Sequence, residues 1–153
     1  FKLPKHKILE NVETVPGTDG QKMSKSYGNT IELFAEDEEI QKAVMGILTD
    51  SKGVEESKDP EECNVFAMHK LFSSEDELGE IRKKYVEGGM GYKESKDILV
   101  KNIQDFIGPM REKRKEIAKN PERVLEILKK GGEVARQRAE EKMIDVRKKI
   151  GLV

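Results

Sequence analysis

The chain has 153 residues, of which 39% are charged and 35% hydrophobic, and its net charge is −1 because 29 basic residues nearly balance 30 acidic ones. This length accommodates one or two domains, and the balanced charge excludes a global field that attracts nucleic acid, so any RNA contact needs local patches. No apolar run approaches the ~20 residues of a membrane span and no signal-peptide pattern is present, so we expect no membrane partner and a cytoplasmic protein.

Residues 1–15 precede a loop and contain a short apolar stretch. Leu3 stands before a proline, which favours an extended backbone at that position. Ile8, Leu9 and Val12 lie close together in the chain, and we expect them to form a strand-like segment that leads into the loop.

The loop is predicted over residues 16–31, where one proline and three glycines, Gly20 among them, fall within thirteen residues. This content excludes a regular helix and allows a loop that moves. The loop carries, in order, Lys22, Met23, Ser24, Lys25 and Ser26. Two ammonium groups, two hydroxyls and freed backbone N–H groups form a cradle that suits a polyphosphate better than a single carboxylate.

The rest of the sequence predicts helices. A helix is expected to begin at Asp37, with an apolar face of Ile40, Val44, Ile47 and Leu48 at helical spacing. Asp59-Pro60 has the composition of a helix start, and Ser74 followed by Glu77 is typical of a capping box that opens the next helix.

Three further helices are predicted towards the C-terminus. A long one covers residues 93–118, a short one runs from Asn120-Pro121 to Leu128, and Gly131-Gly132 is expected to end it. A last helix, from about Glu133 to Gly151, has an apolar stripe at spacings of four, four, three and four residues, formed by Ala135, Ala139, Met143, Val146 and Ile150.

Cys63 is the only cysteine, which excludes an intramolecular disulfide and a metal site made of cysteines alone. We expect it to be a buried small side chain at the start of a helix. His69 is expected on the surface of its helix or half-buried, and no metal site is predicted.

Two basic clusters lie among glutamates near the C-terminus. One contains Arg111, Lys113, Arg114 and Lys115, and the other contains Arg136, Arg138, Lys142, Arg147, Lys148 and Lys149. Both are typical of a solvated, ion-paired helix face, and contact with tRNA phosphates is the alternative.

The order Lys22-Met23-Ser24-Lys25-Ser26 is the second signature of class I aminoacyl-tRNA synthetases, which this sequence resembles. The flanking residues 17–31 are similar to those of tryptophanyl-tRNA synthetases. A second block agrees with the C-terminal half of that family, and it consists of Thr49-Asp50-Ser51, Cys63-Asn64-Val65-Phe66 and Gly89-Met90-Gly91-Tyr92 with Lys93 and Lys96. The resemblance covers roughly residues 1 to 150.

The resemblance implies an enzyme that joins tryptophan to ATP, releases pyrophosphate and passes the amino acid to its tRNA. By matching positions, Lys22 and Lys25 would be catalytic and contact phosphate oxygens, and Ser24 and Ser26 would hydrogen-bond nearby. The backbone around Met23 would meet the adenine, and Gly20 belongs to the same ATP-binding segment. Mg²⁺ would accompany ATP, and the full-length enzyme is expected to be a homodimer.

The family's first signature, a His-Ile-Gly-His type motif, is absent, since the only histidines are His6 and His69. We therefore expect the C-terminal part of a longer enzyme, not active alone. The expected fold is mainly α. Residues 1–35 would end a Rossmann-type α/β nucleotide-binding domain that carries the loop, and residues 36–153 would form a helical tRNA anticodon-binding domain, whose last helix is a candidate to pack back on the catalytic domain.

Two alternatives remain at this point. A tyrosyl-tRNA synthetase fragment has a related fold and signature, although the Gly89-Met90-Gly91-Tyr92 block favours tryptophan. A non-catalytic RNA-binding helical module is a different class, but such a module would be expected to lose the paired lysines or their glycine flanks, and both are intact.

Overall fold

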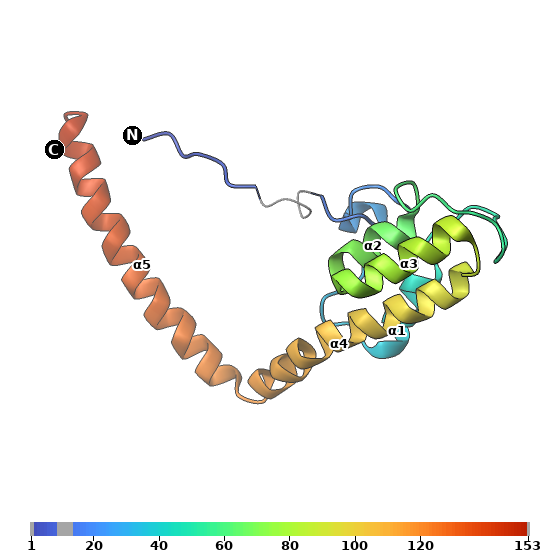
Figure 1. The fold of residues 1–153 in the computed structure, drawn as a ribbon. Helices are drawn as coiled ribbons and strands as arrows, with labels where there is room; N and C mark the ends of the chain where they lie inside the picture. The colour runs from blue at the N-terminus through green and yellow to red at the C-terminus, as the bar shows by residue number, and fades with distance from the viewer. Residues whose placement is uncertain (1, 9–13, 153) are drawn as a thin grey trace. The chain divides into compact units, whose positions relative to one another are not determined.

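A computed structural model describes residues 2–8 and 14–152, and the chain divides into two compact units, Phe1–Arg111 and Glu112–Val153. The helices are a short 3-10 helix at Lys25–Tyr27, α1 (Asp37–Met45), α2 (Asn64–Phe72), α3 (Glu75–Glu87), α4 (Tyr92–Ala118) and α5 (Pro121–Lys149) (Figure 1). The described residues contain no strand, only an isolated bridge between Pro16 and Lys22. The predicted mainly α fold is confirmed, while the Rossmann tail and the boundary at residue 35 stay predictions.

The strand-like segment expected over residues 6–12 falls largely outside the described residues. Its described part, residues 6–8, is exposed and forms no regular element. Within residues 2–8 and 14–152, no helix combines the length and apolar character that a membrane crossing requires.

Helices α1, α2 and α3 and the first half of α4 pack around the core of the first unit (Figure 1). The predicted start of α1 at Asp37 is confirmed, with a reciprocal capping box between Glu36 and Glu39. Ile40 and Val44 are buried as predicted, but the helix ends at Met45. The core also contains Ile47 and the following side chains: Val65, Phe66, Met68, Ile81, Tyr85, Met90, Leu99, Val100, Ile103 and Ile107.

Two predictions about this unit are wrong in detail. Leu48 was expected on the apolar face of α1, but it lies beyond the helix and is exposed. The start expected at Asp59-Pro60 is a turn in which Asp59 Oδ1 accepts from the N–H of Glu61 at 2.8 Å. Helix α2 begins only at Asn64, after Cys63 at its N-cap. The Asp59 carboxylate accepts from a backbone N–H of the turn, so it does not cap a helix.

Two buried cations hold the connection between α1 and α2: Lys58 bonds within it, and Lys96 bonds to its start from α4. Lys58 is only 1% exposed, and its Nζ donates to the carbonyls of Gly53 at 2.5 Å and Glu56 at 3.0 Å. Lys96 donates to the carbonyls of Met45 at 2.9 Å and Ile47 at 2.7 Å, just past the end of α1. A cation satisfies these carbonyls at the negative end of the helix dipole, although burial lowers the pKa of Lys96.

His69 is completely buried, so the prediction of a surface or half-buried residue is wrong. Its Nε2 lies 3.1 Å from the carbonyl oxygen of Ser95, which only accepts, so Nε2 carries the proton. Its Nδ1 then accepts from the hydroxyl of Ser73 at 2.8 Å. Both ring nitrogens are satisfied within the protein, which is why the imidazole tolerates complete burial in its neutral form.

The same polar chain continues to α3 and to the start of α2. The Tyr85 hydroxyl donates to Ser95 Oγ at 2.8 Å, and the Cys63 thiol lies 3.9 Å from the Tyr85 oxygen. Burial raises the pKa of Tyr85, so its hydroxyl stays a donor. Cys63 is buried beside the start of α2, as predicted.

The second unit contains the end of α4 and helix α5. Asn120 caps α5 by accepting from the N–H of Arg123 at 3.0 Å, and Pro121 occupies its first turn, as predicted. The break expected at Gly131-Gly132 is wrong, because one continuous helix runs from Pro121 to Lys149. Each glycine costs about 1 kcal/mol relative to alanine, but the flanking Glu and Lys residues are strong helix formers and tolerate it.

We predict that the stability of the fold falls with acid because His69 is buried neutral. Burial lowers the pKa of His69 in the folded state, so below pH ~6.5 the unfolded chain binds the proton first. The free energy of unfolding should therefore fall by up to about 1.4 kcal/mol per pH unit as the pH decreases from 7 towards 5. Urea unfolding across this range measures the slope.

The matched control is the exposed His6. His69→Gln should remove the slope above pH 5, and His6→Gln should keep it. Equal slopes in both variants would contradict the assignment of this acid sensitivity to His69.

Candidate functional site

The predicted loop that carries Lys22 and Lys25 is closed by a backbone hydrogen bond between residues 18 and 29. The N–H of Thr18 donates to the carbonyl of Asn29 at 3.0 Å, so the two ends of the loop meet. At its start, the N–H of Gly17 donates to the carbonyl of Gln21 at 2.6 Å, which forms a tight turn around Gly20. Gly20 has φ +80°, a left-handed conformation that glycine adopts without strain. The chain therefore makes a compact surface loop of the kind that often carries function.

The two predicted lysines lie on the outside of this loop. Lys22 follows the turn and Lys25 begins the short 3-10 helix, and both side chains are exposed. Among the described residues neither ammonium group is in an ion pair or a side-chain hydrogen bond. They are therefore available to an anion.

The other predicted site residues have mixed surroundings. Ser24 Oγ accepts from the N–H of Ser26 at 3.3 Å and caps the 3-10 helix, whereas Ser26 itself is exposed. Met23 packs its half-buried side chain against the core, and its N–H donates to the carbonyl of Val15 at 2.8 Å. The structure thus brings the five signature residues into one loop, and their contacts with ATP stay predictions.

Asn29 fills the centre of the loop and was not predicted as a site residue. Its side chain is 2% exposed, and its Oδ1 accepts from the N–H of Ser24 at 2.7 Å. Its Nδ2 donates to Asp19 Oδ1 at 2.7 Å and to the carbonyl of Lys22 at 3.2 Å. The hydrogen bond from Asn29 also keeps the pKa of Asp19 below its usual range. The only sequence signal was its place just after Gly28.

The turn of this loop rests on the helical core. The N–H of Leu48 donates to the carbonyl of Thr18 at 2.9 Å, and Asn64 Nδ2 donates to the carbonyl of Leu48 at 3.0 Å. A Cβ atom at Gly20 would lie 2.3 Å from Asn64 Oδ1. Leu48 and Asn64 therefore hold the base of the loop.

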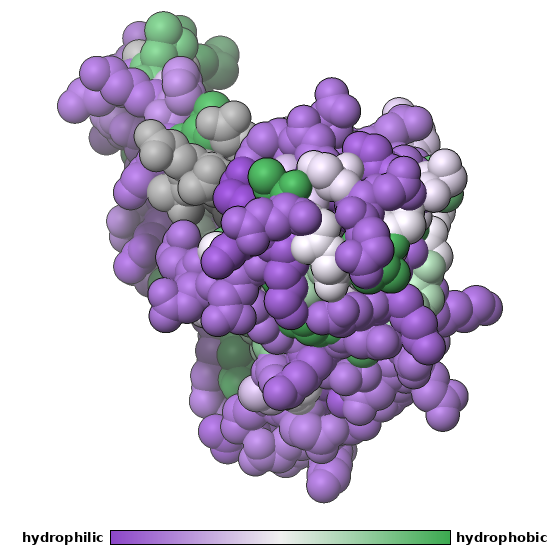
Figure 2. Space-filling view, turned by 45° about the vertical axis from the view of Figure 1, so that its right-hand side comes forward, coloured by the Kyte–Doolittle hydropathy of each residue, from purple (hydrophilic) through white to green (hydrophobic). Residues whose placement is uncertain are grey.

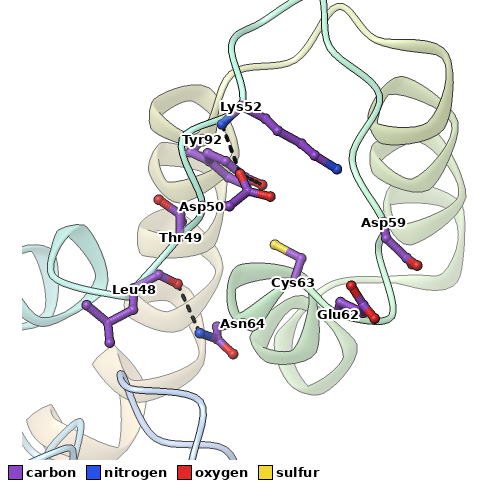
Figure 3. A pocket seen from close by; sticks show the side chains of 9 residues that line it. All are labelled: Leu48, Thr49, Asp50, Lys52, Asp59, Glu62, Cys63, Asn64 and Tyr92. Atoms are coloured by element: carbon purple, nitrogen blue, oxygen red, sulfur yellow. Dashed lines mark hydrogen bonds between the residues drawn. The ribbon is translucent and has the colours of Figure 1, made fainter.

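A pocket of about 280 Å³ lies next to this contact, between the 48–52 segment and the start of α2 (Figure 3). It is lined by Leu48, Thr49, Asp50, Lys52, Asp59, Glu62, Cys63, Asn64 and Tyr92. Three carboxylates face one lysine there, so hydrogen-bond acceptors dominate its charged lining. Within the described residues no group of three or more His, Cys, Asp or Glu side chains is arranged to hold a metal ion.

Asp50 is fixed on one side of this pocket. The N–H of Lys52 donates to its Oδ1 at 3.0 Å and the Tyr92 hydroxyl donates to the same atom at 2.8 Å. These hydrogen bonds, the one from Lys52 first, lower the pKa of Asp50, and burial together with this contact raises the pKa of Tyr92. At neutral pH Asp50 is therefore an anion and Tyr92 a neutral donor.

Residues 1–108 match the family model described as tRNA synthetases class I (W and Y). This chain belongs to the class I tRNA synthetases. The matched residues include the loop, the pocket and most of the first unit. The resemblance predicted from the signature residues is thereby confirmed.

Within this synthetase family, the chain is similar to tryptophan enzymes. The chain is 42% identical over 153 residues to the tryptophan–tRNA ligase of Fusobacterium nucleatum, and the alignment covers 100% of this chain and 47% of that protein. It is 41% identical over 152 residues to the tryptophan–tRNA ligase of Campylobacter jejuni, with 99% of this chain and 48% of that protein covered.

The crystal structure of the Campylobacter jejuni tryptophanyl-tRNA synthetase complexed with ADP and tryptophan has the same fold in the shared part. It matches 99% of this chain and 48% of that chain at 41% identity, with a TM-score of 0.83. The synthetase chain described here thus spans about half the length of the curated relatives it matches.

The residues of the two predicted basic clusters differ in their exposure and in their partners. Arg111 was predicted in an exposed basic cluster, but its side chain is 11% exposed and its Nη2 lies 2.8 Å from Asp37 Oδ1 at the start of α1. It also donates to the carbonyl of Ala35 at 2.7 Å. The described ion pairs in the two clusters and between them are Lys113–Glu116, Lys115–Glu112, Lys130–Glu126, Lys142–Asp145 and Lys149–Asp145.

Lys113, Lys115, Lys142 and Lys149 are therefore ion-paired along their own helices. Figure 2 shows hydrophilic side chains covering most of one face of the molecule, with apolar groups only in small spots. Contact between tRNA phosphates and the clusters stays a prediction.

We predict that Gly20→Ala destabilises this unit more than Gly28→Ala does. Both glycines have positive φ, 80° and 66°, so alanine brings a similar backbone strain of about 1 kcal/mol at each. Only at Gly20 does the added Cβ meet Asn64, whereas nothing lies within 4 Å at Gly28. Displacing Asn64 should break its hydrogen bond to Leu48 and add about 1–3 kcal/mol.

Urea unfolding measures both losses. In an Asn64→Ala background the Gly20→Ala loss should shrink to that of Gly28→Ala. An unchanged difference there would show that Asn64 is not the cause.

Proposed function

We propose that this chain is the C-terminal part of an enzyme that activates tryptophan with ATP and transfers it to tRNA. The observation that carries the proposal is the closed loop that presents Lys22 and Lys25 to solvent within a chain of this synthetase family. The relatives' shared name, tryptophan–tRNA ligase, supports tryptophan over tyrosine as the amino acid. The segment by itself is not expected to catalyse.

Lys22 and Lys25 would bind the phosphate oxygens of ATP. As the carboxylate of tryptophan attacks the α-phosphorus, the bond to the β-phosphate oxygen breaks and negative charge grows on the leaving pyrophosphate. Ammonium groups already placed beside those oxygens stabilise the growing charge without reorganisation. The 3-10 helix at Lys25–Tyr27, capped by Ser24 and Gly28, would hold the backbone of Lys25 in one conformation.

ATP would bring Mg²⁺ with it. The loop itself offers ammonium and hydroxyl groups, and its one carboxylate, Asp19, already accepts from Asn29 and from the N–H of Gln21. This donor set fits phosphate oxygens rather than direct Mg²⁺ coordination, for which oxygen ligands are required. When bound, Mg²⁺ would neutralise charge on the phosphates.

The predicted helical domain, residues 36–153, would bind tRNA, and the pocket beside α2 is our candidate contact. Asp50, Asp59 and Glu62 are acceptors, which match the exocyclic amines of cytosine or adenine and repel phosphates. A single-stranded nucleotide is therefore a better occupant than a duplex backbone. A homodimer and a cytoplasmic location stay predictions from the family resemblance and the sequence.

Lys25→Ala in the full-length enzyme should slow tryptophan-dependent pyrophosphate exchange by about 100-fold, because one preorganised contact to the leaving group is lost. The dissociation constant for tryptophan should stay unchanged, since the lysine acts on ATP. Exchange kinetics and equilibrium binding measure the two effects. Lys42→Ala, on the exposed side of α1, is the matched control and should leave both unchanged. Equal losses in exchange and in tryptophan binding for Lys25→Ala would rule out a leaving-group role.

Glu62→Gln should raise the KM for tRNA in aminoacylation by about tenfold, because it replaces a charged acceptor with a neutral amide whose NH2 group cannot accept, and a well-matched base contact is worth about 1–3 kcal/mol of discrimination. Pyrophosphate exchange without tRNA should keep its rate. Glu55→Gln, an exposed acid outside the pocket, should change neither reaction. If Glu62→Gln left the KM for tRNA at its original value, the pocket would not be the tRNA contact.

A further inference from the structure

We infer that Asn29 is a positioning residue that sets the spacing of Lys22 and Lys25, and that Asp19 is its partner. The inference rests on the proposed role of the loop in binding ATP phosphates. Neither residue is expected to touch ATP. Their effect would reach the reaction through the backbone of the two lysines.

The first support is the place of the two backbone contacts. Asn29 Nδ2 donates to the carbonyl of Lys22 itself, and Asn29 Oδ1 accepts from the N–H of Ser24, the residue directly before Lys25. One planar amide therefore holds the chain at both lysines. Because the two atoms of the amide lie at a fixed separation, the backbone between the lysines cannot lengthen without losing one contact.

The second support is the burial of this amide. Asn29 is 2% exposed, and a buried amide that loses its partners costs free energy, so the loop conformation that satisfies it is strongly favoured. A Cβ atom at residue 17 would lie 2.2 Å from Asn29 Nδ2, so only glycine there leaves room for the side chain. The close approach of Gly17 blocks the amide from leaving on that side.

The third support is the identity of the partner. Asp19 Oδ1 accepts from Asn29 Nδ2 at 2.7 Å and from the N–H of Gln21 at 3.0 Å. A carboxylate only accepts when ionised, so it fixes which end of the Asn29 amide points toward it. This orientation leaves Oδ1 facing the N–H of Ser24. Asp19 thus sets the direction of the amide, and the amide sets the loop.

The exchange of one atom tests this arrangement. Asn29→Asp has the same shape and keeps an acceptor for Ser24, but it puts an oxygen against Asp19 and against the carbonyl of Lys22. In the full-length enzyme we expect it to lower kcat for pyrophosphate exchange by roughly 10- to 100-fold, as a misplaced catalytic group does, with the KM for tryptophan unchanged. Asp19→Asn alone keeps one acceptor oxygen but no longer fixes the direction of the Asn29 amide, so it should lower kcat less than Asn29→Asp does.

Two readouts separate positioning from general damage. Adding Asp19→Asn to Asn29→Asp restores a donor between the two side chains and should recover part of the lost kcat. The two facing carboxylates of Asn29→Asp hold a shared proton more tightly than one alone, so its kcat relative to that of the original enzyme should rise as the pH falls from 8 to 6. Urea unfolding shows whether Asn29→Asp still folds. If it does not, Asn29→Ala, which adds no charge, takes its place in the test and should lower kcat by a similar factor.

The outcomes distinguish this inference from the proposed function. If Lys25→Ala slows exchange but Asn29→Asp and Asn29→Ala do not, the positioning role is wrong and the phosphate role stands. If Lys25→Ala has no effect on exchange, the proposed function of the loop fails first. A loss in Asn29→Asp that neither the second substitution nor the lower pH relieves would also overturn the role of Asp19.

Discussion

The first unit depends on the requirement that each buried polar group find a partner inside the protein. Asn29, Lys58, His69 and Lys96 are all buried, and each bonds to at least one backbone carbonyl, within its own loop for Asn29 and Lys58 and in another segment for His69 and Lys96. A buried polar group without a partner costs more than a typical hydrogen bond contributes. The irregular segments between the helices are therefore held in place by side chains whose burial is tolerated only in this arrangement.

This constraint explains how a loop without regular structure presents two cations at a defined spacing. The apolar part of the loop is small, since Met23 alone among the signature residues packs against the core. Polar contacts do the rest, through Asn29 at the centre and Leu48 and Thr18 at the base.

The sequence was informative where local chemistry decides the structure. The signature loop, the starts of α1, α3 and α5 and the extent of α4 follow from glycine, proline and capping residues within a few positions. The sequence failed where distant partners decide. His69 is buried because Ser73 and Ser95 satisfy it, and Arg111 leaves its basic cluster because Asp37 and Ala35 bind it. At Gly131-Gly132 the two glycines indicated a turn, but the strong helix formers on both sides keep the helix continuous.

The two candidate binding surfaces of this unit have opposite charges and a common base. The loop presents Lys22 and Lys25, and the pocket presents Asp50, Asp59 and Glu62, so a phosphate chain is attracted to the first and repelled by the second. Leu48 lies between them, because its N–H binds Thr18 of the loop while its carbonyl accepts from Asn64 of the pocket. A ligand that displaces Asn64 in the pocket therefore breaks its hydrogen bond to Leu48, the residue whose N–H holds Thr18 at the base of the loop. The backbone of Leu48 therefore connects the two candidate surfaces through hydrogen bonds.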